Sequence, residues 1–171
     1  MFFSFFSQKK GAKALFVVCC LACGTSLFTA CVDNPSPAGT LAGTWTSAGG
    51  DNFTVNEAAK TFVYWYGTGE PDYGSTMDFA GTIEYGSNSL SSRAGYLTLR
   101  LTNSGGWNGY AAGTYIRVFW KDLTGGTVQY ATPYKVGGNN NGESSLGAAA
   151  TEYTVENGYF GMLGAYTKIG N

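Results

Sequence analysis

The stretch Tyr96-Leu97-Thr98-Leu99-Arg100-Leu101-Thr102 decides the fold. Its apolar and polar residues alternate with a period of two, so the three leucines share one face and Arg100 lies on the other. This is the period of a β-strand that packs one face on a core and exposes the other to water. The stretch therefore predicts a sheet protein with an apolar interior.

Most of the chain after residue 40 repeats this period. Turns rich in Gly, Asn and Ser separate the segments, and Asn157-Gly158 predicts a tight hairpin that follows a strand at 153–156. No long helix is expected, although 146–151 suits one helical turn. The other segments that we predict as strands are 41–45, 53–56, 61–66, 77–85, 115–121, 127–132 and 159–169.

These segments, roughly eight to nine short strands joined in sequence by tight turns, indicate one all-β domain folded as an antiparallel up-and-down meander. We expect the meander to close into a barrel, because closure pairs the two edge strands that an open sheet would expose. A β-sandwich is the alternative. We assign this domain to residues 41–171.

Two pairs of carboxylates lie at alternate positions of predicted strands. In segment 77–85 we expect the odd-numbered residues to face the core, and Asp78 and Glu84 to face water. Glu152 and Glu156 form a similar pair, which we also expect on a solvent face. A glycosidase needs two carboxyl groups about 5–10 Å apart in a cleft, so solvent-facing pairs do not predict that chemistry.

Aromatic residues carry the positive functional signal, because all four tryptophans and all twelve tyrosines lie beyond residue 31. Inward aromatic residues either line a ligand cavity or fill the core of a small barrel. Aromatic residues in loops either anchor a partner or pack locally. The inward candidates are Trp45, Phe53, Tyr85, Trp120 and Tyr130. The loop candidates are Tyr73, Trp107, Tyr110 and Tyr134.

Residues 1–30 have the pattern of a signal peptide. Three lysines precede an apolar run at 14–30, which is interrupted by Gly24-Thr25-Ser26 and is too short for a permanent transmembrane helix. The run ends in two small residues before Cys31, whose thiol is a nucleophile that can accept a lipid. We therefore expect a signal peptide at 1–30, and a lipidated Cys31 followed by a flexible, proline-containing tether at 31–40.

Phe28-Thr29-Ala30-Cys31 resembles a lipobox, the processing motif of bacterial lipoproteins, in the permissive form found in spirochaetes. The resemblance implies cleavage before Cys31 and attachment of diacylglycerol and palmitate to that residue. Cys23 is a second candidate. Val32 follows Cys31 in place of the aspartate that retains many lipoproteins at the inner membrane, so the resemblance favours the outer membrane of the cell envelope.

Gly43-Thr44-Trp45 resembles the Gly-x-Trp signature that opens the first strand of calycins, the superfamily of lipocalins and avidin-like barrels. In calycins the tryptophan plugs the closed end of the barrel and a basic residue of the last strand packs over it. Lys168 would take that place here. The resemblance implies a carrier of a small apolar ligand or, as for some small calycin-like barrels, an inhibitor of hydrolases.

Composition excludes several classes of function. The chain has no histidine, so a Ser-His-Asp or Cys-His catalytic site and a histidine-ligated metal site are impossible. All eleven acidic residues but only seven of the ten basic ones lie beyond Cys31, which gives that part a net charge of −4 and no basic footprint for nucleic acid. No phosphate-binding glycine motif is present.

Together these patterns predict a lipid-anchored protein of the cell envelope with a binding role and no enzymatic activity. Acyl chains on Cys31 would hold it to a membrane. Its partner would be a protein, a glycan or a small apolar ligand. We expect no cofactor, no metal and no nucleic acid. The alternatives are a lipocalin-like carrier and an inhibitor of an envelope hydrolase.

Overall fold

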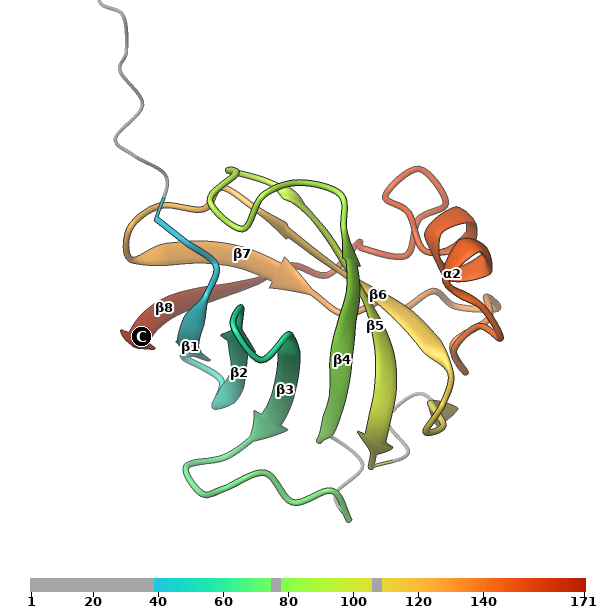
Figure 1. Ribbon diagram of the computed structural model, residues 1–171, viewed down its shortest axis with the longest axis horizontal. Helices are drawn as coiled ribbons and strands as arrows, with labels where there is room; N and C mark the ends of the chain where they lie inside the picture. Colours follow the sequence, from blue (N-terminus) through green and yellow to red (C-terminus); the bar gives the residue numbers. More distant parts are fainter. Residues whose placement is uncertain (1–38, 75–77, 106–108) are drawn as a thin grey trace, which may run out of the picture. The chain divides into compact units, whose positions relative to one another are not determined.

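The computed structural model describes residues 39–74, 78–105 and 109–171, which form a closed barrel of antiparallel strands (Figure 1). Its strands are β1 (Gly43–Ser47), β2 (Asp51–Asn56), β3 (Thr61–Tyr66), β4 (Phe79–Gly86), β5 (Gly95–Ser104), β6 (Tyr115–Lys121), β7 (Thr127–Ala131) and β8 (Gly164–Gly170). Each strand pairs with the next one in sequence, and β8 pairs with β1 to close the barrel. The predicted meander barrel is confirmed, with eight strands, and the sandwich alternative is wrong. The predicted signal peptide and Cys31 lie outside the described residues.

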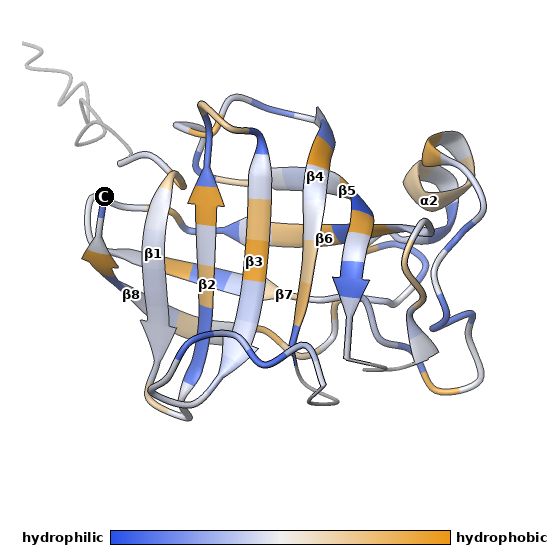
Figure 2. Ribbon diagram, turned by 60° about the horizontal axis from the view of Figure 1, so that its bottom comes forward, coloured by the Kyte–Doolittle hydropathy of each residue, from blue (hydrophilic) through white to orange (hydrophobic). Residues whose placement is uncertain are grey.

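The alternation in β5 positions the core as the sequence predicts. Leu97, Leu99 and Leu101 are at most 1% exposed, whereas Arg100 between them is exposed. Thr98, on the outer face of the strand, is also buried, because another layer covers this part of the barrel. Figure 2 shows the strands side by side, coloured by hydropathy, with the covering helix beside β5 and β6.

Stacked aromatic rings fill much of the barrel interior. The ring centroid of Phe53 lies 6.0 Å from that of Trp45, 5.8 Å from Phe62 and 4.4 Å from Tyr130. Phe62 in turn stacks on Phe79 at 5.9 Å. All five side chains are at most 2% exposed. Each such pair contributes about 0.5–1.5 kcal/mol beyond the burial of its area, so this part of the interior is a packed core.

The covering layer is built by α2 (Leu146–Glu152) and the chain around it. Arg117, on the outer face of β6, donates a hydrogen bond from Nη1 to the carbonyl oxygen of Ala150 at 2.8 Å. Its guanidinium carbon lies 4.2 Å from the centroid of the Tyr96 ring on β5. Arg117 therefore ties the helix to the barrel wall. None of the helices in the described ranges has the length and hydropathy of a transmembrane span.

The strand predicted at 153–156 and its hairpin at Asn157-Gly158 are wrong. Tyr153 is instead the C-cap of α2, and its N–H donates to Ala149 O at 3.0 Å. The side-chain amide of Asn157 donates to the carbonyl oxygens of the last two helical residues at 3.0 and 2.8 Å. The last carbonyl groups of a helix have no partner within the helix and accept hydrogen bonds from nearby donors. Here the donor is the side chain of Asn157, which therefore caps α2 instead of forming a hairpin turn.

One irregularity in β4 changes which of its side chains face inward. The register with β5 shifts between Ala80 and Gly81, where the extra residue belongs to β5, and again between Ile83 and Tyr85, where the extra residue is Glu84 of β4. An extra residue in a strand reverses the faces of the residues that follow it. Tyr85 is consequently 50% exposed, so the prediction that it lies inside the barrel is wrong.

Candidate functional site

One end of the barrel is closed by Trp45. The indole Nε1 donates to the carbonyl oxygen of Leu41 at 2.9 Å, and the Leu41 N–H donates to Leu90 O at 2.8 Å, so the segment before β1 covers the ring. The ammonium of Lys168 on β8 lies 5.8 Å from the centroid of the indole. The contact predicted between Lys168 and Trp45 is confirmed.

Gly43 allows this close approach between the first and last strands. Its φ of +121° lies in a region that L side chains rarely adopt, and a Cβ there would clash with Gly170 O and would lie 2.6 Å from Lys168 Cε. A residue other than glycine would push β8 and its lysine away from β1.

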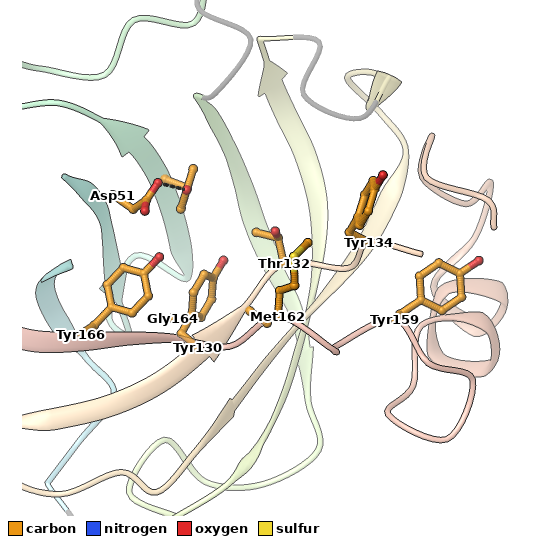
Figure 3. A pocket seen from close by; sticks show the side chains of 10 residues that line it. Asp51, Tyr130, Thr132, Tyr134, Tyr159, Met162, Gly164 and Tyr166 are labelled. Carbon is orange, nitrogen blue, oxygen red and sulfur yellow. Dashed lines mark hydrogen bonds between the residues drawn. The ribbon is translucent and has the colours of Figure 1, made fainter. Parts of the chain in front are cut away.

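The opposite end holds a pocket of about 570 Å³ (Figure 3). It opens where β2 and β8 begin and where β3 and β7 end, so the closure of the sheet brings its walls together. Tyrosine is its main component. The residues that line it are Asp51, Tyr64, Tyr130, Ala131, Thr132, Tyr134, Tyr159, Met162, Gly164 and Tyr166.

Asp51 is the only charged residue in this lining, as far as the described part of the chain forms it. The tight turn between β1 and β2 positions it, because Ser47 Oγ accepts a hydrogen bond from Asp51 N at 3.0 Å and donates to Asp51 Oδ2 at 3.3 Å. The Tyr64 hydroxyl donates to Asp51 Oδ1 at 2.6 Å. Both donors to the carboxylate are neutral hydroxyl groups, and Asp51 forms no ion pair with any residue that the structure describes.

Tyr130 forms part of the pocket floor. It is 2% exposed, it stacks on Phe53, and its hydroxyl has no hydrogen-bond partner in the described part of the chain. A buried hydroxyl without a partner costs about 1–3 kcal/mol, so a ligand that supplies a partner would recover this cost. The Tyr166 ring stands edge-on to Tyr130, with 5.5 Å between centroids.

The three phenols around Asp51 are uncharged at neutral pH. Burial raises the pKa of the Tyr130 hydroxyl well above its usual range. Burial also raises the pKa of Tyr64, and the hydrogen bond to Asp51 adds to this effect. Burial, together with the charge of Asp51, raises the pKa of Tyr166. Among the residues that the structure describes, Asp51 therefore supplies the only charge in this part of the pocket.

Tyr159 lies on the other side of the pocket, near α2 (Figure 3). Its hydroxyl donates to Glu152 Oε1 and accepts a hydrogen bond from Asn139 N at 2.9 Å. Burial and the bond to Glu152 raise the pKa of Tyr159 to about 12. The ammonium of Lys135 lies 5.5 Å from the centroid of its ring. At the rim, Tyr134 is 38% exposed and Met162 is 72% exposed.

The structure separates the predicted inward residues. Trp45, Phe53 and Trp120 are fully buried and belong to the packed core, whereas Tyr130 alone of the five lines the pocket. The Trp120 indole Nε1 donates to Ser92 O at 3.1 Å, which fixes it near the closed end.

The predicted loop residues also differ in their location and exposure. Tyr134 lines the pocket and Tyr73 is 37% exposed in the connection from β3 to β4. Tyr110 is 3% exposed and its hydroxyl donates to Pro133 O at 2.7 Å, so of the two alternatives for this residue the structure shows local packing and not an exposed anchor. Its hydroxyl reaches a backbone acceptor across the barrel end, which makes burial favourable. Trp107 lies outside the described residues.

Asp78 is not on a solvent face, as had been predicted from the alternation. It is 1% exposed, and its carboxylate accepts hydrogen bonds from the backbone N–H groups of Tyr66 and Asp72. These bonds compensate for its burial and fix the loop after β3.

Within the described ranges, no group of three or more Cys, Asp or Glu side chains could hold a metal ion.

Sequence reasoning missed Asp51, Tyr64, Tyr159 and Tyr166. The available signal was the alternation of Tyr64 with Phe62, which places both side chains inside the barrel. Asp51 gave no such signal, because it lies at a turn that the sequence marks only as polar.

Comparison of the chain with protein-family models, with curated proteins and with solved structures finds no match. The geometry of the pocket is therefore the main guide to function.

Proposed function

We propose that the protein is a lipid-anchored lipoprotein of the cell envelope whose barrel binds a small molecule at its open end without transforming it. The observation that carries this proposal is the pocket of about 570 Å³, with the unpartnered hydroxyl of Tyr130 at its floor. Ligand pockets of proteins commonly have volumes of about 300–1,000 Å³, with apolar and aromatic walls and a few polar groups. This pocket has that composition.

The chemistry of the lining supports binding rather than catalysis. Its ionisable groups are one carboxylate, Asp51, and the phenols, and burial raises the pKa of four of these: Tyr64, Tyr130, Tyr159 and Tyr166. Acid–base catalysis near neutral pH needs a group that gains and loses protons there, and these phenols do not.

The anchoring part of the proposal depends on the lipobox resemblance at residues 28–31, and the carrier part is supported by the packing of Lys168 over Trp45, as in calycins. Acyl chains on Cys31 would attach the protein to the outer membrane. The barrel would present its pocket to the surrounding compartment.

The experiment for the ligand is native mass spectrometry of the full-length protein released from detergent micelles. We expect a bound small molecule on the wild type. Thr132→Trp fills the pocket from its wall and should remove the bound mass, whereas Thr102→Trp, at an exposed position of β5, should retain it. A folded wild type that carries no molecule and binds none from a metabolite extract would contradict the proposal.

The experiment for the anchor is metabolic labelling with palmitate. We expect the label on the wild type and on Cys23→Ser, and its loss from Cys31→Ser. Equal labelling of Cys31→Ser and the wild type would contradict lipidation at this residue.

A second candidate function is docking of a protein or glycan at the loops. It is favoured by the exposure of Tyr73 and Tyr134, which follow strands that end at the pocket side of the barrel. Tyr73→Ala, outside the pocket lining, would weaken capture of such a partner and leave the bound small molecule in place. Inhibition of an envelope hydrolase stays a prediction.

A further inference from the structure

We infer that the pocket at the open end of the barrel selects an organic cation, an ammonium group carried on an apolar body. This inference rests on the proposed function, since it names the class of ligand that the pocket would hold. It follows from the charge of the lining, the orientation of its phenols and the position of the nearest lysine.

The first step is the unpaired charge of Asp51. Its two hydrogen bonds come from Tyr64 and Ser47, and neither donor carries a charge. An ionised carboxylate has acceptor sites for about four hydrogen bonds, so sites on Asp51 stay available to a ligand. A cationic group is the partner that a carboxylate prefers at the edge of an apolar pocket, because the bond is then assisted by charge on both sides.

The second step concerns the rings beside Asp51. The faces of aromatic rings attract cations, and this attraction is the basis of the aromatic cages that bind ammonium ligands. Tyr64, Tyr130 and Tyr166 supply such rings. Figure 3 shows the hydroxyls of Tyr130 and Tyr166 pointing toward the side of the pocket on which Asp51 lies.

The hydroxyl of Tyr130 favours a ligand that can donate a hydrogen bond. It is buried and has no partner among the described residues, while its oxygen can accept a hydrogen bond. An ammonium group has several N–H donors, so it can donate both to a carboxylate and to a phenol oxygen. A carboxylate ligand would instead be repelled by Asp51, and a neutral ligand would leave its charge unpaired.

The surroundings of Tyr159 determine how the ligand is oriented. Lys135 does not line the pocket, but its ammonium lies 5.5 Å from the centroid of the Tyr159 ring, so a positive charge stands beside this end of the pocket. Figure 3 places Tyr159 and Asp51 on opposite sides of the pocket. Repulsion by Lys135 therefore favours the ligand cation at the Asp51 side, with the apolar body toward Met162 and Tyr134 at the rim.

The test uses three probes with the same indole ring: tryptamine, which is cationic, tryptophol, which is neutral, and indole-3-propionate, which is anionic. Their dissociation constants for the full-length protein in detergent are measured by ligand-observed NMR titration. We expect tryptamine to bind about tenfold more tightly than tryptophol, and indole-3-propionate to bind most weakly.

Asp51→Asn should abolish the preference for tryptamine over tryptophol, which is measured as the ratio of their two dissociation constants. Asp122→Asn is the matched control, because it makes the same change in charge at an exposed position after β6, at the closed end of the barrel. It should retain the tenfold preference. Tyr130→Phe is a second variant that removes only the unpartnered hydroxyl, and it should weaken tryptamine several-fold while the fold is kept.

The outcomes separate the inference from the proposed function. If tryptophol binds as tightly as tryptamine, or if the preference for tryptamine survives in Asp51→Asn, the pocket binds ligands but does not select a cation, and the inference is overturned alone. If the folded wild type binds none of the probes and carries no molecule of its own, the proposed function fails and the inference fails with it.

Discussion

The ammonium of Lys168 lies 5.8 Å from the ring centroid of Trp45, and the two residues are opposite each other on the last and first strands of the barrel. The same contact therefore closes the sheet and covers the residue that plugs one end. Trp45 is fully buried and stacks on Phe53, so the seam between β1 and β8 is continuous with the aromatic core.

Lys168→Met tests the energy of this contact, because methionine keeps an apolar stem of similar length and removes the charge. We expect the free energy of unfolding to fall by about 0.5–2 kcal/mol, the range of a partly desolvated cation–π contact. Urea unfolding followed by tryptophan fluorescence measures it. Lys168→Arg should keep most of the stability. Lys121→Met, a lysine at the end of β6, is the control, and an equal loss there would show that the Trp45 contact contributes nothing.

Gly43→Ala and Gly147→Ala should have opposite effects on stability. At Gly43 the positive φ and the collision with Gly170 and Lys168 predict a loss of about 2 kcal/mol or more. At Gly147, within α2, an added Cβ meets nothing within 4 Å, so alanine should raise the free energy of unfolding by about 0.5–1 kcal/mol. Thermal and urea unfolding of both variants check the signs. A stable Gly43→Ala would show that β1 and β8 can separate at this point without cost.

The sequence predicted the barrel because its strands depend on local alternation. The segments 61–66 and 115–121 coincide with β3 and β6, and the leucines of β5 face the core as expected. The errors lie where a non-local contact overrides the local pattern. Asn157 serves the end of α2 instead of a hairpin, and a bulge in β4 turns Tyr85 outward.

The pocket was much harder to predict than the barrel. Its walls come from the ends of strands that are distant in sequence, and the closure of the sheet brings them together. Alternation shows that Tyr130 faces inward, but it does not show that its hydroxyl lacks a partner. The role of Asp51 depends on Tyr64, which is its neighbour only after β2 and β3 pair.

Arg117→Met should loosen the outer layer more than the barrel. The change removes the hydrogen bond to Ala150 O and the contact with the Tyr96 ring, and we expect a loss of about 1–3 kcal/mol. Amide hydrogen exchange compares the variant with the wild type. The increase in exchange rate caused by Arg117→Met should be larger in α2 than in β5. Arg117→Lys can donate to Ala150 but cannot stack as a plane, so it should recover only part of the loss. Arg100→Met, at an exposed position, is the control. Unchanged protection of α2 in Arg117→Met would show that the helix is held by apolar packing alone.

The raised pKa values of the buried tyrosines predict loss of stability at alkaline pH. Burial and the bond to Glu152 raise the pKa of Tyr159 from 10.0 to about 12. Below pH 10 the phenol is neutral in both states, so its contribution to stability is fully present. Between pH 10 and about 12 the unfolded chain releases this proton and the folded chain keeps it, so unfolding becomes more favourable as the pH rises. Burial also raises the pKa of Tyr130, so this phenol adds to the loss of stability at alkaline pH.

Tyr130→Phe isolates one phenol in this pH dependence, because its hydroxyl has no partner to lose among the described residues. At pH 7 we expect the variant to be as stable as the wild type or more stable. Between pH 10 and 12 the free energy of unfolding should fall less steeply with pH in the variant than in the wild type. The difference between the two slopes should be about 1.4 kcal/mol per pH unit, which is the contribution of one proton. Urea unfolding over this pH range, with tyrosinate absorbance recorded in parallel, measures the two slopes. Lysines titrate in both proteins and cancel in the difference. Equal slopes would mean that Tyr130 ionises as readily in the folded barrel as in the unfolded chain, and the pocket floor would then be open to water.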